Sequence, residues 1–129
     1  MTRRLTTSEL KVIRNQFLIS QNSRCAICQA PITTRQGQDP VLDHCHRTGA
    51  VRGVLHRSCN ALLGKVENNQ ARFGVRDLQS FCHGAGKYLM MHKQNITGLI
   101  HSTHLTEDEK RIKRNKQAVA RRVKAKKKL

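Results

Sequence analysis

The apolar residues near the start of the chain recur with the period of an amphipathic helix. These side chains are Leu10, Ile13, Phe17 and Leu18. Apolar positions three or four residues apart lie on one face of a helix. Thr6 precedes Glu9 by three positions, which is the spacing of a capping box at a helix start. The pattern therefore predicts a helix over residues 8–20 with one apolar face.

The pattern in the middle of the chain is typical of a β-hairpin followed by a helix. Val41 and Leu42 form a short apolar pair. Residues 48–49 are Thr-Gly, which favours a turn, and residues 51–55 have the composition of a returning strand. Helical spacing resumes over residues 60–65. We therefore expect a short hairpin that leads into a helix.

The rest of the chain predicts two further helices. Residues 75–91 have apolar side chains at helical positions, although two glycines weaken the pattern. Residues 92–105 show no period. Thr106 precedes three acidic residues, a sequence that favours the start of a helix. We expect a domain over residues 1–91, then a linker, and a basic C-terminal helix or tail over residues 106–129.

The charge of the chain is strongly basic and unevenly distributed. There are 25 Lys and Arg residues against 8 Asp and Glu, a formal net charge of +17. Residues 110–129 contain 11 of the basic residues and no acidic one. This excess predicts a polyanionic partner, with nucleic acid as the first candidate and a membrane surface as the second. A basic protein of the ribosomal kind is the alternative.

The expected compartment bears on how the cysteines are interpreted. The first residues lack the apolar stretch of a signal peptide, and no apolar run approaches the roughly 20 residues of a membrane span. We therefore expect a cytoplasmic protein with no membrane association, in which disulfides are rare. Five cysteines then indicate metal ligands or free thiols. Aromatic residues make up only 3% of the chain, so we expect a thin core that a metal stabilises.

Two pairs of soft metal ligands share the same i, i+3 spacing. The first pair is Cys25 and Cys28, and the second is His56 and Cys59. Together they supply four ligands for a tetrahedral Zn²⁺, which leaves no open position for water. A redox role for the first pair would need a βαβ context, which the pattern does not show. Cys82 has no partner in sequence and is expected to be a small buried residue.

The segment between the two pairs combines side chains suited to phosphodiester hydrolysis. Asp43 and Asn60 offer oxygen ligands, which Mg²⁺ and Mn²⁺ prefer. His44 offers a general base, and His46 either positions a phosphate or packs behind the site. Arg52 is as well placed to support the hairpin backbone as to bind phosphate. The side chains expected to contact nucleic acid are Arg47, Arg52, Arg57, Lys65, Arg121 and Arg122.

This segment resembles the phage recombination endonuclease VII family, which belongs to the His-Me finger (HNH-like) nucleases. The shared pattern is D-H-x-H-x-T-G-x-V-R-G-x-L-(C/H)-x-x-C-N-x-x-L-G, preceded by C-x-x-C, and it runs from Cys25 to Gly64. The family usually has Cys where this chain has His56. The part beyond Met91 has no counterpart in the pattern.

The resemblance implies a fold and a set of residue roles. The fold is α+β, a small zinc-stabilised ββα-metal (His-Me finger) core flanked by helices, with a β-hairpin from about 41 to 56 and a helix starting near Asn60. Asp43 and Asn60 would hold the catalytic Mg²⁺ or Mn²⁺, and His44 would be the general base. The residues that would hold the structural Zn²⁺ are Cys25, Cys28, His56 and Cys59.

The expected function is that of a metal-dependent DNA endonuclease, with branched or mismatched DNA as the substrate that the resemblance implies. Homing, nicking or non-specific cleavage is an alternative within nucleases. A non-catalytic zinc-finger module that binds nucleic acid is an alternative outside them. Symmetric cutting of a junction needs two active sites, so it would imply a homodimer. A phage or host protein partner is left open, and a phage-encoded chain would act in the cytoplasm of its bacterial host.

Overall fold

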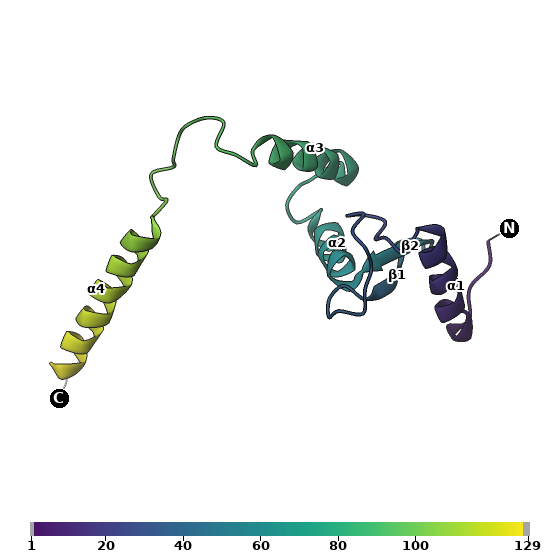
Figure 1. Cartoon of the computed structure of the whole chain (residues 1–129), viewed down its shortest axis with the longest axis horizontal. Coiled ribbons are helices and arrows are strands. Elements are labelled where there is room, and N and C mark those ends of the chain that lie inside the picture. Colours follow the sequence, from purple (N-terminus) through teal and green to yellow (C-terminus); the bar gives the residue numbers. More distant parts are fainter. Residues whose placement is uncertain (1, 128–129) are drawn as a thin grey trace. The chain divides into compact units, whose positions relative to one another are not determined.

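The computed structural model describes residues 2–127, which form an α+β chain with one two-stranded sheet and four helices. In chain order the elements are α1 (Thr7–Ser20), β1 (Pro40–His44), β2 (Val51–His56), α2 (Arg57–Asn69), α3 (Leu78–Met91) and α4 (Glu107–Lys126) (Figure 1). Contacts divide the chain into two compact units, Met1–His83 and Gly84–Leu129. The α+β class expected from the sequence is confirmed.

α1 begins at the capping box that the sequence predicts. The Glu9 carboxylate accepts a hydrogen bond from the backbone N–H of Thr6 at 2.8 Å. This contact satisfies a donor that would otherwise lack a partner at the helix start. The helix predicted over residues 8–20 is confirmed over Thr7–Ser20, and its apolar face is partly buried.

β1 and β2 form an antiparallel hairpin whose register shifts at one point. Asp43 pairs with Gly53, but the next residue, His44, pairs with Val51. Arg52 is therefore an extra residue on β2, and the hairpin contains a β-bulge at this position. A bulge bends its strand and changes the direction of the side chains around it.

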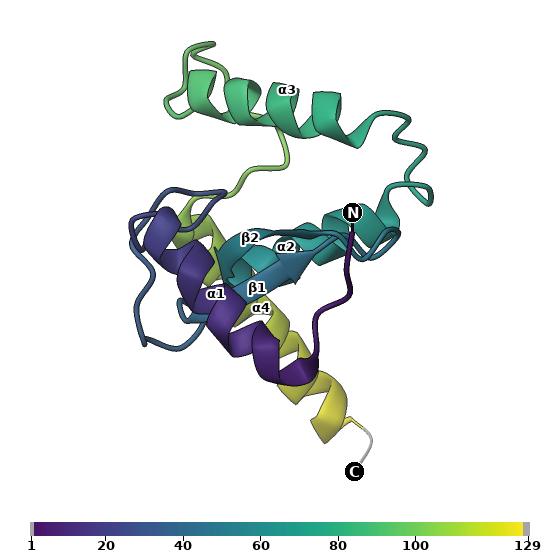
Figure 2. The ribbon, with the colours of Figure 1, turned by 90° about the vertical axis from the view of Figure 1, so that its right-hand side faces the viewer.

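The buried core of the first unit is small. Among residues 2–127 the buried hydrophobic side chains are Cys25, Val54 and Leu55, each at most 2% exposed. Asp43 and His56 are buried polar residues. Both α1 and α2 pack against the hairpin, which lies between them in the two views of Figure 1 and Figure 2. So few buried apolar groups leave much of the fold's stability to polar contacts and metal ligands.

A glutamine side chain completes the hydrogen bonding along the edge of β2. The Gln21 Oε1 accepts from the Val54 N–H at 2.8 Å, and Gln21 Nε2 donates to the Val54 carbonyl at 2.8 Å. The same Nε2 donates to the Arg24 carbonyl at 2.8 Å. Gln21 comes directly after α1, so its amide joins the end of that helix to β2.

α2 begins at Arg57, three residues earlier than the Asn60 start that the sequence indicates. Helix starts leave several N–H groups without intrahelical partners. Here the Arg57 N–H donates to the Asp39 carbonyl and the Ser58 N–H donates to the Gly37 carbonyl, each at 3.0 Å. The preceding loop therefore caps the helix, and Asn60 lies within its first turn.

α3 begins later than its apolar pattern predicts, at Leu78 instead of residue 75. The Asp77 carboxylate accepts hydrogen bonds from the Ser80 N–H at 3.1 Å and from the Ser80 hydroxyl at 2.7 Å. This side chain caps the helix and sets its start. The expectation that Cys82 is buried is wrong. Its side chain is exposed, and no residue of α3 is buried in the described structure.

α4 begins after Thr106, as the sequence predicts, and Thr106 and Glu109 form a capping box there. The Thr106 hydroxyl accepts from the Glu109 N–H at 3.2 Å, and the Glu109 carboxylate accepts from the Thr106 N–H at 2.7 Å. Residues 92–105, which precede this helix, contain no helix or strand. Within the part of the chain that the structure describes, no helix has both the length and the apolar character needed to cross a bilayer.

We predict that Gln21→Ala lowers the free energy of unfolding by about 1–3 kcal/mol, because the Val54 N–H loses its partner next to the core, while the Val54 carbonyl keeps only the Ala26 N–H. Gln16→Ala is the matched control, since Gln16 is an exposed residue of α1. Urea unfolding of both variants in zinc-saturated buffer, followed by circular dichroism, measures the difference. Equal stability of the two variants would show that the Gln21 amide does not support β2.

Candidate metal centre and active site

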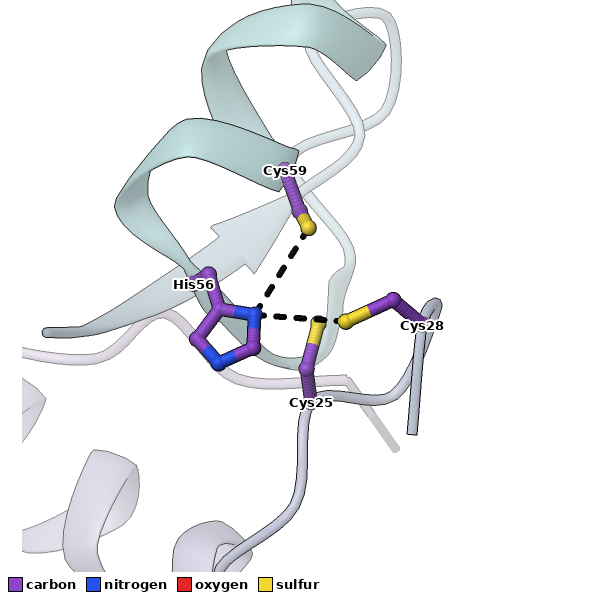
Figure 3. Close-up of side chains that lie close together, drawn as sticks. All are labelled: Cys25, Cys28, His56 and Cys59. Atoms are coloured by element: carbon purple, nitrogen blue, oxygen red, sulfur yellow. Dashed lines mark hydrogen bonds between the residues drawn. The ribbon is translucent and has the colours of Figure 1, made fainter. Parts of the chain in front are cut away.

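Three cysteines and a histidine converge where the loop after α1 meets the start of α2. Cys25 and Cys28 lie in that loop, His56 ends β2, and Cys59 lies in the first turn of α2 (Figure 3). Their ligand atoms all lie within 4.8 Å of one another. The His56 Nδ1 is 3.3 Å from the Cys28 Sγ and 3.7 Å from the Cys59 Sγ.

These distances suit a tetrahedral zinc site. Zinc bonds of about 2.0–2.3 Å in a tetrahedron separate neighbouring ligand atoms by about 3.4–3.8 Å. The two measured separations from His56 Nδ1 are close to that range. The sequence predicts these four side chains as zinc ligands, and the structure places them as a cluster that can hold one zinc ion.

The second nitrogen of His56 determines which form of the ring faces the cluster. His56 Nε2 lies 2.9 Å from the Pro31 carbonyl oxygen. A carbonyl oxygen only accepts hydrogen bonds, so Nε2 carries the proton and donates it. In the neutral ring, Nδ1 then has a free lone pair directed at the sulfur atoms. Metal-binding histidines are oriented in this way by an outer hydrogen bond.

Burial and neighbouring groups control the ionisation of the cluster thiols. Burial opposes ionisation of Cys25, but hydrogen bonds from neighbouring backbone groups, the strongest from Cys28, outweigh it and lower the pKa of Cys25 to about 7. Burial and the adjacent thiols of Cys28 and Cys25 raise the pKa of Cys59 to about 11. Once one thiolate has formed, its negative charge therefore opposes ionisation of the neighbouring thiols. A bound divalent cation would offset that charge.

A separate cavity of about 240 Å³ lies between the hairpin and α2. Its lining includes Asp43 of β1, His46 of the hairpin turn and Asn60 of α2. Asp43 is 6% exposed, so its carboxylate is buried at the base of the hairpin bulge. The cavity therefore brings together a carboxylate, an imidazole and a carboxamide that the sequence predicts as active-site groups. The complete lining is Asp43, His46, Arg52, Asn60, Ala61, Gly64, Lys65, Glu67 and Asn68.

His44 lies next to this cavity without lining it. Both His44 and His46 are exposed, and their ring centroids are 5.1 Å apart with the planes tilted by 38°. His46 lines the cavity, whereas His44 does not. The predicted base, His44, is therefore not part of the cavity lining, but its ring lies next to that of His46, which is.

Arg52 makes two bidentate ion pairs across the cavity. Its Nε and Nη2 donate to the two Asp43 carboxylate oxygens at 2.6 and 3.0 Å. Its Nη2 and Nη1 donate to the two Glu67 oxygens at 2.8 and 3.3 Å. Hydrogen bonds with Asp43 and then with Glu67 raise the pKa of the Arg52 guanidinium further. The guanidinium that was expected to bind phosphate or the hairpin backbone is here held between two carboxylates.

The other expected nucleic-acid contacts lie in different surroundings. Lys65 of α2 lines the cavity, and Arg47 is exposed in the hairpin turn. Arg57 donates to the Asp39 carboxylate at 2.9 and 2.6 Å, and this hydrogen bonding lowers the pKa of Asp39. Arg121 and Arg122 are exposed on α4, which belongs to the second unit.

Glu67 is the charged residue of the cavity that the sequence interpretation missed. It follows Asn60 by seven positions and Gly64 by three, and all three line the cavity. Residues three, four and seven positions apart lie on one face of a helix. The same periodicity that defines an apolar face therefore contained the signal for this acidic residue.

The family model described as recombination endonuclease VII matches residues 2–90, which is more than two thirds of the chain. The matched region includes both the Cys/His cluster and the cavity beside it. α4 and its basic residues lie beyond the match. The chain therefore belongs to the recombination endonuclease VII family.

Proposed function

We propose that this protein is a metal-dependent DNA endonuclease that hydrolyses phosphodiester bonds at the cavity between the hairpin and α2. The observation that carries the proposal is the shared cavity of Asp43, Asn60 and His46, with His44 beside it, in a member of an endonuclease family. On this proposal β1, β2 and α2 form the ββα-metal core of a His-Me finger nuclease.

The donor chemistry of the cavity fits a hard divalent cation. Asp43 offers carboxylate oxygens and Asn60 offers an amide oxygen, and both line the same space. Mg²⁺ and Mn²⁺ prefer such oxygen ligands and usually keep several waters, for which a cavity of about 240 Å³ has room. When bound, the cation would supply positive charge that stabilises the phosphate as negative charge develops in the transition state.

The histidines supply the proton transfer. His44 is exposed, so its imidazole can reach a water molecule and act as the general base that takes the proton from it. His46 lines the cavity and orients the phosphate next to that water. Lys65 lines the same cavity and adds a positive charge toward the phosphate. Attack in this arrangement gives 5′-phosphate and 3′-hydroxyl ends, as the family resemblance implies.

The Cys/His cluster has a structural role in this proposal. Four protein ligands leave no position for a reactive water, so a zinc ion held by them would not take part in cleavage. The ligands come from the loop after α1, the end of β2 and the start of α2. A zinc ion would therefore tie together the segments that form the cavity.

The basic residues of α4 would supply affinity for DNA that does not depend on sequence. Residues 110–129 contain 11 basic residues, and the described part of α4 has no buried residue. Contacts between such residues and phosphates release counterions, which makes binding steeply dependent on salt.

Branched DNA is the proposed substrate, and a homodimer would provide the two active sites that symmetric cutting requires. Cleavage of a four-way junction, a mismatched duplex and a plain duplex of matched length tests this choice directly. Preference for the junction supports resolution of branched DNA. Equal cutting of all three substrates would support a non-specific nuclease, and sequence-dependent cutting of plain duplex would support a homing or nicking enzyme.

We expect His44→Ala to reduce DNA cleavage by about 10²–10⁴-fold, because the general base is lost. His83→Ala is the control, since His83 is an exposed histidine of α3 outside the cavity. Nicking of supercoiled plasmid with Mg²⁺ or Mn²⁺, with and without EDTA, measures the loss. Zinc content should be equal in both variants. Cleavage by His44→Ala at the rate of the unmodified protein would remove His44 from the mechanism, and binding without cleavage by the unmodified protein would support a non-catalytic zinc-finger module.

We expect Cys25→Ser to reduce bound zinc from one ion per chain to none and to abolish cooperative unfolding. Zinc binding of the structural kind provides about 10–16 kcal/mol at pH 7, more than a small core supplies. Protons compete for the thiolates and for His56, so zinc should also be released as the pH falls. Elemental analysis and thermal unfolding measure both effects. Cys82→Ser, an exposed cysteine outside the cluster, should retain zinc, and retention by Cys25→Ser would exclude Cys25 as a ligand.

We expect deletion of residues 110–129 to flatten the salt dependence of DNA binding. Each phosphate contact on duplex DNA contributes about 0.9 to the slope of log affinity against log salt. The measurement uses the His44→Ala protein with and without the segment, so that the DNA stays intact. An unchanged slope would show that this segment makes no phosphate contact.

A further inference from the structure

Arg52 connects carboxylates from two different elements inside one cavity. Asp43 belongs to β1 and Glu67 to α2, and the Arg52 guanidinium contacts both oxygens of each. The bulge on β2 makes Arg52 an extra residue opposite β1, which allows its side chain to reach Asp43. The contact is therefore built into the hairpin and is more than a chance surface pair.

The two carboxylates differ in how much they depend on Arg52. The Asp43 side chain is 8% exposed and the Glu67 side chain is 27% exposed. A buried carboxylate without a positive partner is strongly unfavourable, whereas a partly exposed one is stabilised by water. Among residues 2–127, Arg52 is the side chain that donates hydrogen bonds to the Asp43 carboxylate. Arg52 thus supplies the positive charge that Asp43 needs when no metal is bound.

The proposed function places a second demand on the same carboxylate. Asp43 is the proposed cation ligand, but both of its oxygens are engaged by the guanidinium fork. A divalent cation and a guanidinium on one carboxylate repel each other. Arg52 must therefore release Asp43, at least in part, before Asp43 can ligate a metal.

We propose that Glu67 is a positioning residue that receives the Arg52 guanidinium when Asp43 takes up the catalytic cation. Arg52 is then a placeholder cation for Asp43, and Glu67 retains it within the cavity after the exchange. This inference rests on the proposed function, because it assumes that Asp43 binds the metal. No covalent step is involved.

The geometry explains why Glu67 suits this role. It already holds Arg52 through two hydrogen bonds at 2.8 and 3.3 Å, so the exchange breaks the contacts with Asp43 and keeps those with Glu67. A retained guanidinium stays beside the phosphate-binding cavity, where freed N–H groups can donate to a phosphate oxygen. The phosphate contact expected for Arg52 from the sequence then becomes available only in the metal-bound state.

A double-mutant cycle separates this role from direct metal ligation by Glu67. The variants are Arg52→Gln, Glu67→Gln and the combination, each in zinc-saturated protein without DNA. Mn²⁺ affinity is measured from the electron paramagnetic resonance signal of free Mn²⁺. Arg52→Gln removes the competing cation and should bind Mn²⁺ about tenfold more tightly than the unmodified protein. Glu67→Gln should bind about tenfold more weakly, and the combined variant should match Arg52→Gln within about twofold.

Two further variants keep the cycle interpretable. Asp43→Asn should abolish the measured Mn²⁺ binding, which locates the signal at the cavity. Arg52→Lys retains a positive charge for Asp43 but lacks the fork that spans both carboxylates. In the R52K background, Glu67→Gln should weaken Mn²⁺ binding by less than about threefold. Mn²⁺ should raise the melting temperature of Arg52→Gln more than that of the unmodified protein, because Asp43 loses its guanidinium partner in that variant.

The outcomes distinguish failure of this inference from failure of the proposed function. An equal loss of Mn²⁺ affinity from Glu67→Gln in every background would make Glu67 a direct ligand and overturn the inference. Weaker Mn²⁺ binding by Arg52→Gln would also overturn it. The proposed function fails separately if the variants show the expected cycle of Mn²⁺ affinities but the unmodified protein does not cut DNA. Absence of Mn²⁺ binding by the unmodified protein overturns both.

Discussion

The convergence of Cys25, Cys28, His56 and Cys59 is the constraint on which the rest of the first unit depends. Within residues 2–127, Cys25 is one of three buried hydrophobic residues and His56 is one of two buried polar ones, so the candidate metal cluster is itself a large part of the core. A core this small cannot offset the conformational entropy of the chain by apolar burial alone. Metal binding and folding are therefore expected to be one equilibrium.

The same cluster sets the geometry of the cavity. His56 ends β2 and Cys59 lies three residues later in the first turn of α2. Because both side chains converge on the same cluster, they constrain the direction in which α2 leaves the sheet. Asn60 follows Cys59 directly and lines the same cavity as Asp43. In the proposed function, the separation of the proposed cation ligands thus depends on a cluster that takes no part in the chemistry.

The sequence was sufficient where the determining contacts are local, and insufficient where they are not. The starts of α1 and α4 depend on residues three positions apart, such as Thr6 with Glu9, and both were predicted correctly. The start of α2 depends on carbonyls of Gly37 and Asp39, some twenty residues before it, and was placed three residues late. The partners of Arg52 lie 9 and 15 residues away on other elements, and a bulge directs it toward them. Neither effect leaves a periodic signal.

The charges around the cavity imply that attraction of DNA and chemistry on DNA are separate tasks. The charged residues of the cavity lining are two acids, Asp43 and Glu67, and two bases, Arg52 and Lys65, which balance. A neutral cavity has no net attraction for a phosphate, whereas residues 110–129 contain 11 basic residues and no acid. In the proposed function the basic segment concentrates DNA nearby at all times. The cavity becomes attractive to a phosphate only when a divalent cation adds two positive charges, so cleavage requires the metal even where binding does not.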